Sequence, residues 1–244
     1  MRRTQIAITL LMLLMVGVVA CSQKPTPTPA GNSGSVPSTP GALPDLAQKP
    51  TPQEVSSFNG CPPQGDGGDP VLNRLKNRVD DAGAYYPVLF NAVEKLAWPP
   101  GIERKDHAKW SASDAATVAR YEGIPISVEG YLFDAKQQGP ESTNCHGSTP
   151  EMSDWHVWLT QNAGEDRTQS IVVETTPRVR PSHPTWTLKA LENFAKNKQR
   201  VRISGWLMLD PEHPDQVGKT RGTIWEIHPI MKIEVQEGGS WKPL

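Results

Sequence analysis

Two segments near the C-terminus alternate in residue character with a period of two. In the segment 200–210, every odd position from 201 to 209 is apolar or glycine, whereas Arg202, Ser204 and Trp206 fall on the other parity. The segment 223–235 is similarly rich in alternating apolar residues. A strand with one face in a hydrophobic core requires this pattern. Both segments therefore predict strands that pair with each other.

Three further strands and one helix are predicted upstream of this pair. The strands span 124–133, 154–160 and 169–175, and a helix capped by Thr185 or Thr187 follows them. The order strand, strand, strand, helix, strand, strand, with glycine in the first and fourth strands, resembles the OB-fold, a small five-stranded Greek-key barrel. An open antiparallel sheet with one covering helix is the competing shape. The predicted fold class is mainly β with helices, an OB-fold-like domain over 123–244.

A helical support segment is expected over 69–122. Asp69 followed by Pro70 is typical of a helix N-terminus. Apolar residues recur at helical spacing between residues 88 and 96, and Ser111 with Asp114 resembles a capping box whose helix stops before Gly123. The apolar stripes of these helices predict packing faces.

The N-terminus predicts export and lipid attachment. Residues 1–20 begin with Arg2 and Arg3 and continue with an apolar run, as in a secretory signal peptide. The junction ending in Ala20-Cys21 resembles the bacterial lipobox, which implies lipidation of Cys21 with diacyl (palmitate-type) chains that anchor the protein in a membrane. An ordinary signal peptide with a coincidental cysteine is the alternative. The expected location is the cell envelope, and in a Gram-negative cell the outer membrane, facing the periplasm or the exterior.

Residues 21–68 are expected to form a disordered tether. They are rich in Pro, Thr, Ser and Gly and contain almost no large apolar residues, so they cannot bury enough surface to offset the entropy of ordering. A peptide ligand or a glycan-bearing stalk is the alternative function of this stretch.

The cysteine count predicts one disulfide. The chain has three cysteines, and lipidation of Cys21 would leave Cys61 and Cys145. An exported protein with two remaining thiols most simply joins them. Free or metal-bound thiols are the alternative.

Several short phrases are similar to those of uncharacterised exported bacterial lipoproteins with an OB-fold-like domain. These phrases lie at 141–145, 154–156, 205–207 and 225–229, so the resemblance covers roughly residues 61–244. It implies a fold and a location but no reaction. The formal net charge of -1 gives no global electrostatic case for nucleic acid, which is not expected as a partner.

The OB-fold resemblance also implies where a ligand would bind. Ligands of OB-folds lie across the outer face of strands two and three, flanked by the loops between strands one and two and between strands four and five. Here those loops are 141–146 and 210–219. The candidate ligand-binding residues in this region are His156, Trp158, Glu174, Arg178, His213 and His228.

Three interpretations of these residues stay open. The histidines, helped by Asp154 or Glu174, could hold a divalent metal, although their spacing matches no closed zinc motif. Trp158 and Trp206 with Arg178 could form a stacking surface for a sugar or an unpaired base. In the third interpretation each residue hydrogen-bonds or packs locally.

No catalytic residue is assigned, because the chain lacks a Gly-x-Ser-x-Gly elbow and the Asp-Gly-Asp-Thr motif of nucleases that share the barrel. We therefore expect a lipid-anchored envelope protein whose OB-like domain is a binding or structural module, with an envelope protein or a glycan as partner. The alternatives are a metal-dependent hydrolase using the histidines and Glu174, and a glycan- or oligonucleotide-binding domain. No cofactor is predicted, with a divalent metal left open.

Overall fold

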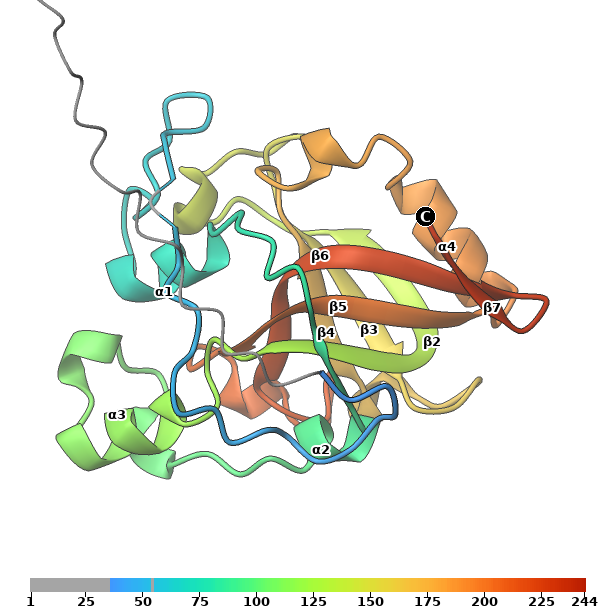
Figure 1. The fold of residues 1–244 in the computed structure, drawn as a ribbon. Coiled ribbons are helices and arrows are strands. Elements are labelled where there is room, and N and C mark those ends of the chain that lie inside the picture. The colour runs from blue at the N-terminus through green and yellow to red at the C-terminus, as the bar shows by residue number, and fades with distance from the viewer. Residues whose placement is uncertain (1–35, 54) are drawn as a thin grey trace, which may run out of the picture. The chain divides into compact units, whose positions relative to one another are not determined.

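Five strands close into a barrel in the computed structural model, which describes residues 36–53 and 55–244. The barrel strands are β2 (Pro125–Gln137), β3 (Trp155–Thr160), β4 (Ile171–Thr175), β5 (Arg200–Leu209) and β6 (Trp225–Glu237). They pair in the order β2-β3-β4-β6-β5, and β5 pairs back with β2 (Figure 1). The β4–β6 pairing is parallel. This closed topology confirms the OB-like barrel and excludes the open sheet.

The period of two decides which side chains fill the barrel. On β2, Ile126 and Val128 are fully buried, and the register pairs them with Gly205 and Ile203 of β5. Alternate residues of the other strands join the same core. The residues of opposite parity point to the outer face of the barrel, where the polar side chains lie.

Two glycines allow the strands to approach each other closely. A Cβ on Gly205 would lie 2.6 Å from a methyl group of Ile227 and would also clash with the carbonyl oxygen of Pro229. A Cβ on Gly130 would lie 3.0 Å from Leu159 and would clash with the carbonyl oxygen of Thr160. The strand register between β5 and β6 shifts at Gly205. Glycine at these positions therefore permits the bends of barrel closure, as the sequence predicts.

The predicted helix between strands three and four of the barrel is α4 (Leu188–Lys196). The hydroxyl of Thr187 caps it by accepting a hydrogen bond from the backbone N–H of Ala190. The helix packs on β2. Thr187 is one of the two N-cap residues that the sequence predicts.

Helices also precede the barrel. They are α1 (Pro70–Lys76), α2 (Phe90–Glu94) and α3 (Ala112–Ala119). Asp69 and Ser111 cap α1 and α3 with their side chains, as predicted. Short 3-10 helices lie in the loops: η1 (Pro100–Ile102), η2 (His107–Lys109), η3 (Ser142–Asn144), η4 (Arg167–Gln169), η5 (Arg180–Ser182) and η6 (Pro214–Gln216).

Two strands at the periphery were not predicted. The strand β1 (Tyr86–Val88) pairs in parallel with β2, so Val88 belongs to a strand and the predicted helix begins only at Phe90. The strand β7 (Ser240–Pro243) pairs with β6. Both strands are too short to show a period of their own, and pairing with the barrel determines their conformation.

Cys61 and Cys145 form the predicted disulfide, with their Cα atoms 5.6 Å apart. It joins the end of the expected tether to the loop between β2 and β3. Gly41, farther upstream, bridges to Val88 of β1. The described residues all belong to one compact unit.

The predicted signal peptide, the lipobox-like junction and Cys21 lie outside the described residues. Within the part of the chain that the structure describes, no helix is both long and apolar enough to span a membrane.

Candidate functional site

A cluster of charged side chains lies buried on the outer face of the barrel, across β3, β4 and β6. His156 of β3 and Glu174 of β4 are direct cross-strand partners, and Nε2 of His156 contacts Oε1 of Glu174. Glu226 and His228 lie on β6 with the parity opposite to the core residue Ile227. The cluster therefore occupies the face on which OB-folds bind ligands.

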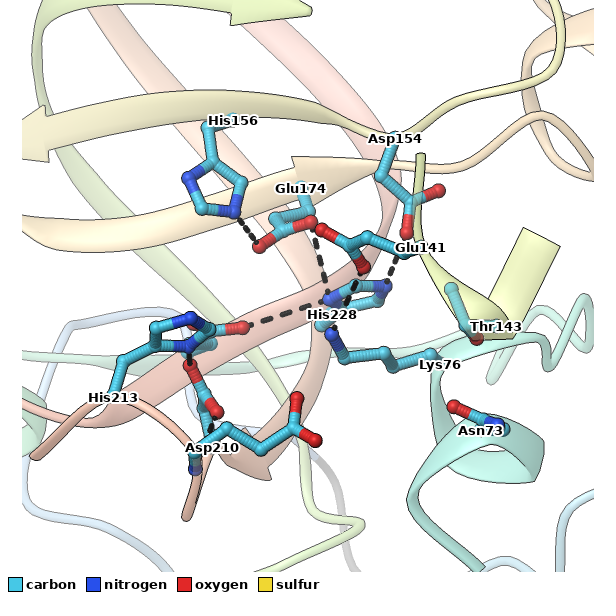
Figure 2. Close-up of polar contacts among 12 residues, drawn as sticks. Asn73, Lys76, Glu141, Thr143, Asp154, His156, Glu174, Asp210, His213 and His228 are labelled. Carbon is cyan, nitrogen blue, oxygen red and sulfur yellow. Dashed lines mark hydrogen bonds and ion pairs between the residues drawn. The ribbon is translucent and has the colours of Figure 1, made fainter. Parts of the chain in front are cut away.

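Three of its residues converge (Figure 2). Asp154, which immediately precedes β3, lies with Oδ2 3.7 Å from Nε2 of His228. Glu174 lies with Oε2 3.6 Å from Nδ1 of the same ring. One donor atom from each of the three residues can be chosen so that all lie within 4.8 Å of one another. A tetrahedral ion with bonds of about 2.1 Å holds its ligand atoms about 3.4 Å apart, so the side chains would have to move closer together to bind one ion.

Five polar atoms of this group have no hydrogen-bond partner among the described residues. Both carboxylate oxygens of Asp154, both ring nitrogens of His228 and Oε2 of Glu174 are buried and unpartnered. The exposed fraction is 1% for Asp154, 1% for Glu174 and 0% for His228. Buried polar atoms are nearly always paired, and an unpaired group calls for a specific explanation such as a bound ion or water.

The surroundings shift the ionisation of these groups in different directions. Burial raises the pKa of Asp154 to about 6, although the nearby His228 opposes this effect. Burial would also raise the pKa of Glu174, but His156 and His228 hold it well below its usual range. Burial would lower the pKa of His228, but Glu174, Glu226 and Asp154 raise it. Such perturbed groups, gathered at one place, are typical of functional sites.

A second group extends the cluster toward the loop between β5 and β6. The guanidinium of Arg221 donates to Asp210 at 2.9 Å and to Glu226 at 2.6 Å. His213 lies with Nδ1 2.7 Å from Oδ2 of Asp210. Oε2 of Glu226 in turn lies 3.5 Å from Nδ1 of His228. Contacts therefore run from the half-exposed His213 to the buried ring of His228.

The cluster contains more carboxylates than permanently charged basic groups. Its four fully buried carboxylates are Asp154, Glu174, Asp210 and Glu226. Against them stand two permanent cations, Arg221 and Lys76 of α1. The acidic charge that these two cations leave has to be neutralised by protonation of the carboxylates or histidines of the cluster, by other nearby basic groups or by a bound cation. A buried charge without a counter-charge is costly, so at least one of these must occur.

The geometry can be read chemically as a metal site. Imidazole nitrogen with carboxylate oxygen is a donor set for first-row divalent ions such as zinc or manganese. Metal-binding histidines usually turn their second ring nitrogen toward a carboxylate, and metal-binding carboxylates are themselves hydrogen-bonded. Glu226 beside His228 and His156 on Glu174 provide both of these supporting contacts.

The structure brings together four of the six predicted ligand-binding residues: His156, Glu174 and His228 directly, and His213 through Asp210. Trp158 lies on the same face but is 7% exposed, with its ring 5.8 Å from that of His156. The guanidinium of Arg178 binds backbone instead: it donates to the carbonyl oxygens of Ser56 and Cys61.

The predicted stacking surface does not form on this face. Trp206 is buried, with the guanidinium of Arg78 3.3 Å from its ring centre and its indole N–H donating to the carbonyl oxygen of Asp80. The segment before β1 therefore covers the ring that a sugar or base would need.

Several members of the cluster were not singled out from the sequence: Lys76, Asp210, Arg221 and Glu226. Glu226 carried a usable signal, because it shares the outward parity of His228 on one strand. Lys76 carried no such sequence signal, since a lysine on a short helix is ordinarily solvated.

Comparisons with protein-family models, with curated proteins and with solved structures found no match. The resemblance to exported bacterial lipoproteins therefore stays a prediction.

Proposed function

We propose that this chain is a lipid-anchored cell-envelope protein whose OB-like domain binds a divalent metal ion through Asp154, Glu174 and His228. One observation carries the metal site. The imidazole of His228 and the carboxylate of Asp154 face each other, fully buried, and in the part of the chain that the structure describes none of their polar atoms has a hydrogen-bond partner. The lipid anchor is supported by the lipobox-like sequence that ends at Cys21.

The acidic surroundings support a cation more than an anion. A divalent cation would neutralise part of the acidic charge of the cluster, while an anion would add to it. The alternative account without metal is a charged imidazolium ring between carboxylates. It is weakened by the separations of 3.5–3.7 Å, which exceed those of direct hydrogen bonds.

Elemental analysis of the full chain tests this proposal. The protein would be purified from membranes in mild detergent, without chelator or metal-affinity tag. We expect about one equivalent of a divalent first-row metal, and its loss in Asp154→Asn and His228→Ala. Asp134→Asn is the control, because Asp134 lies on β2 and pairs with Lys136 at 3.1 Å. A metal-free protein that also fails to take up zinc or manganese by titration would refute the proposal.

A metal-dependent hydrolase is the second candidate, favoured by the position of His156. This side chain is 15% exposed, at the margin of an otherwise buried group, and contacts Glu174. A partly exposed imidazole beside a metal-bound water could act as a general base. The test is hydrolysis of chromogenic phosphate and carboxylate esters by zinc-loaded protein. Activity that is lost in His156→Ala, with metal content unchanged, is the result this candidate requires.

A further inference from the structure

The site is covered by residues 61–80, here called the cover segment. The segment begins at Cys61, which is bonded to Cys145 in the loop between β2 and β3, and it includes α1. Some of its contacts are polar: the side-chain amide of Asn77 donates to the carbonyl oxygen of Thr143 at 2.9 Å. Others are apolar or aromatic: Leu72 is fully buried, and the guanidinium of Arg78 lies 3.3 Å from the ring centre of Trp206. The disulfide and both kinds of contact therefore hold the cover segment over the cluster.

The cover segment brings one charge to the cluster. The side chain of Lys76 is 6% exposed and points toward the carboxylates below it (Figure 2). Among the described residues, the one carboxylate within 4 Å of its Nζ is that of Glu141, at 3.5 Å. An ammonium group has three donors and forms short bonds to carboxylates when it is tightly paired. Lys76 is therefore a loosely held counter-ion of the whole acidic cluster.

Lys76 is protonated at neutral pH. Burial would lower the pKa of Lys76, but Glu141, Glu174, Asp210 and Glu226 together raise it well above its ordinary value. Of these carboxylates, Glu174 is a proposed metal ligand, and Glu226 lies beside Nδ1 of His228. The ammonium and a divalent ion would thus draw on the same negative charge.

We infer that Lys76 is a built-in competitor cation, which lowers the affinity of the site for divalent metal and ties the docking of α1 to metal occupancy. This inference rests on the proposed metal site. Two cations that share one set of carboxylates repel each other. The coupling is reciprocal: by whatever factor docked Lys76 weakens metal binding, bound metal weakens the docking of Lys76 and of α1. The bond between Cys61 and Cys145 keeps the cover segment attached in either state.

The experiment compares zinc affinity among three variants of the full chain. Lys76→Met removes the charge but keeps most of the side-chain length, Lys76→Arg keeps the charge, and Arg74→Met removes a charge from the exposed side of the same helix. We expect Lys76→Met to bind zinc about tenfold more tightly or better, since repulsion at short range in a buried site is strong. We expect Lys76→Arg to stay within about twofold of the unmodified chain because it keeps the charge. Arg74→Met should do the same because an exposed charge is well screened.

Amide hydrogen exchange on the unmodified chain provides a second measurement that needs no variant. Zinc should accelerate exchange in α1 and leave the barrel strands unchanged or slower. Zinc binding with no change in α1, and with equal or weaker affinity in Lys76→Met, would overturn the inference while the proposed function stands. Absence of zinc binding in every variant would instead refute the proposed function, and the competition with it.

Discussion

Nε2 of His228 lies 3.7 Å from Oδ2 of Asp154, and both side chains are closed off from solvent. The two residues come from different elements, Asp154 from the end of the β2–β3 loop and His228 from the middle of β6. Their side chains meet because the parallel pairing of β4 with β6 brings the start of β3 close to β6 through β4. The closure of the barrel therefore creates the site.

The disulfide should contribute strongly to stability. Cys61 and Cys145 are 84 residues apart, and the chain-entropy model assigns a closed loop of that size about 4–5 kcal/mol. We expect the double variant Cys61→Ser, Cys145→Ser to lose about this much free energy of unfolding, measured by urea denaturation. If the reductant-treated unmodified chain and the double variant both unfold at the same urea concentration as the oxidised chain, the bridge does not stabilise the fold.

A buried ion pair should make stability depend on pH. Burial would lower the pKa of His107, but Glu122 and Asp69 raise it. Burial would raise the pKa of Asp69, but its bonds with His107 lower it. The stabilisation from His107 is present below its unfolded pKa of about 6.5 and is lost as pH rises through the raised folded value. The stabilisation from Asp69 is present above its unfolded pKa of about 3.9. It is lost as pH falls through the lowered pKa of the folded state.

The pair should therefore stabilise the fold most between about pH 4 and pH 6.5. Asp69→Asn is a suitable variant because asparagine can still cap α1. We expect its melting temperature to fall farthest below that of the unmodified chain inside this window and to approach it as pH rises through the raised pKa of His107. Asp45→Asn, at an exposed position, is the control. A difference in melting temperature that does not vary with pH would contradict this prediction.

Gly205→Ala should destabilise the barrel. The added methyl group would meet Ile227 at 2.6 Å and the carbonyl oxygen of Pro229, and backbone cannot yield without disturbing the β5–β6 pairing. We expect a loss of about 1–3 kcal/mol in the free energy of unfolding. Gly139→Ala, which has no heavy atom within 4 Å of the added group, should change it by less than about 0.5 kcal/mol. Equal effects of the two substitutions would show that close strand approach does not matter.

The proposed lipid anchor requires chemical modification of one cysteine. Cells grown with labelled palmitate should incorporate the label into this chain, and Cys21→Ala should abolish incorporation. Cys145→Ala is the control, since its thiol is committed to the disulfide. Release of an unlabelled protein into the soluble fraction would favour an ordinary signal peptide instead.

The sequence was informative wherever local pattern determines structure. Alternation of apolar and polar residues located the five barrel strands, and capping side chains located the starts of α1, α3 and α4. The disulfide followed from the number of cysteines. The positions of His156, Glu174 and His228 on one face followed from strand parity combined with the OB-fold resemblance.

The features of the fold and the site that the sequence did not predict depend on contacts between segments distant in the chain. No local pattern distinguishes Lys76, which is buried because α1 covers the ligand face, from the exposed Arg74 on the same helix. The role of Arg178 also depends on distant partners, the carbonyl oxygens of residues 56 and 61. The short strand β1 exists because β2 offers it a free edge.

The most direct test of the metal site is crystallographic. Crystals of zinc-loaded protein would be measured on both sides of the zinc absorption edge. We predict one strong anomalous peak bonded to Asp154, Glu174 and His228, at about 2.0–2.2 Å from each donor atom. An electron-density map with no anomalous peak among these three side chains, and with water or direct hydrogen bonds pairing their polar atoms, would contradict the account.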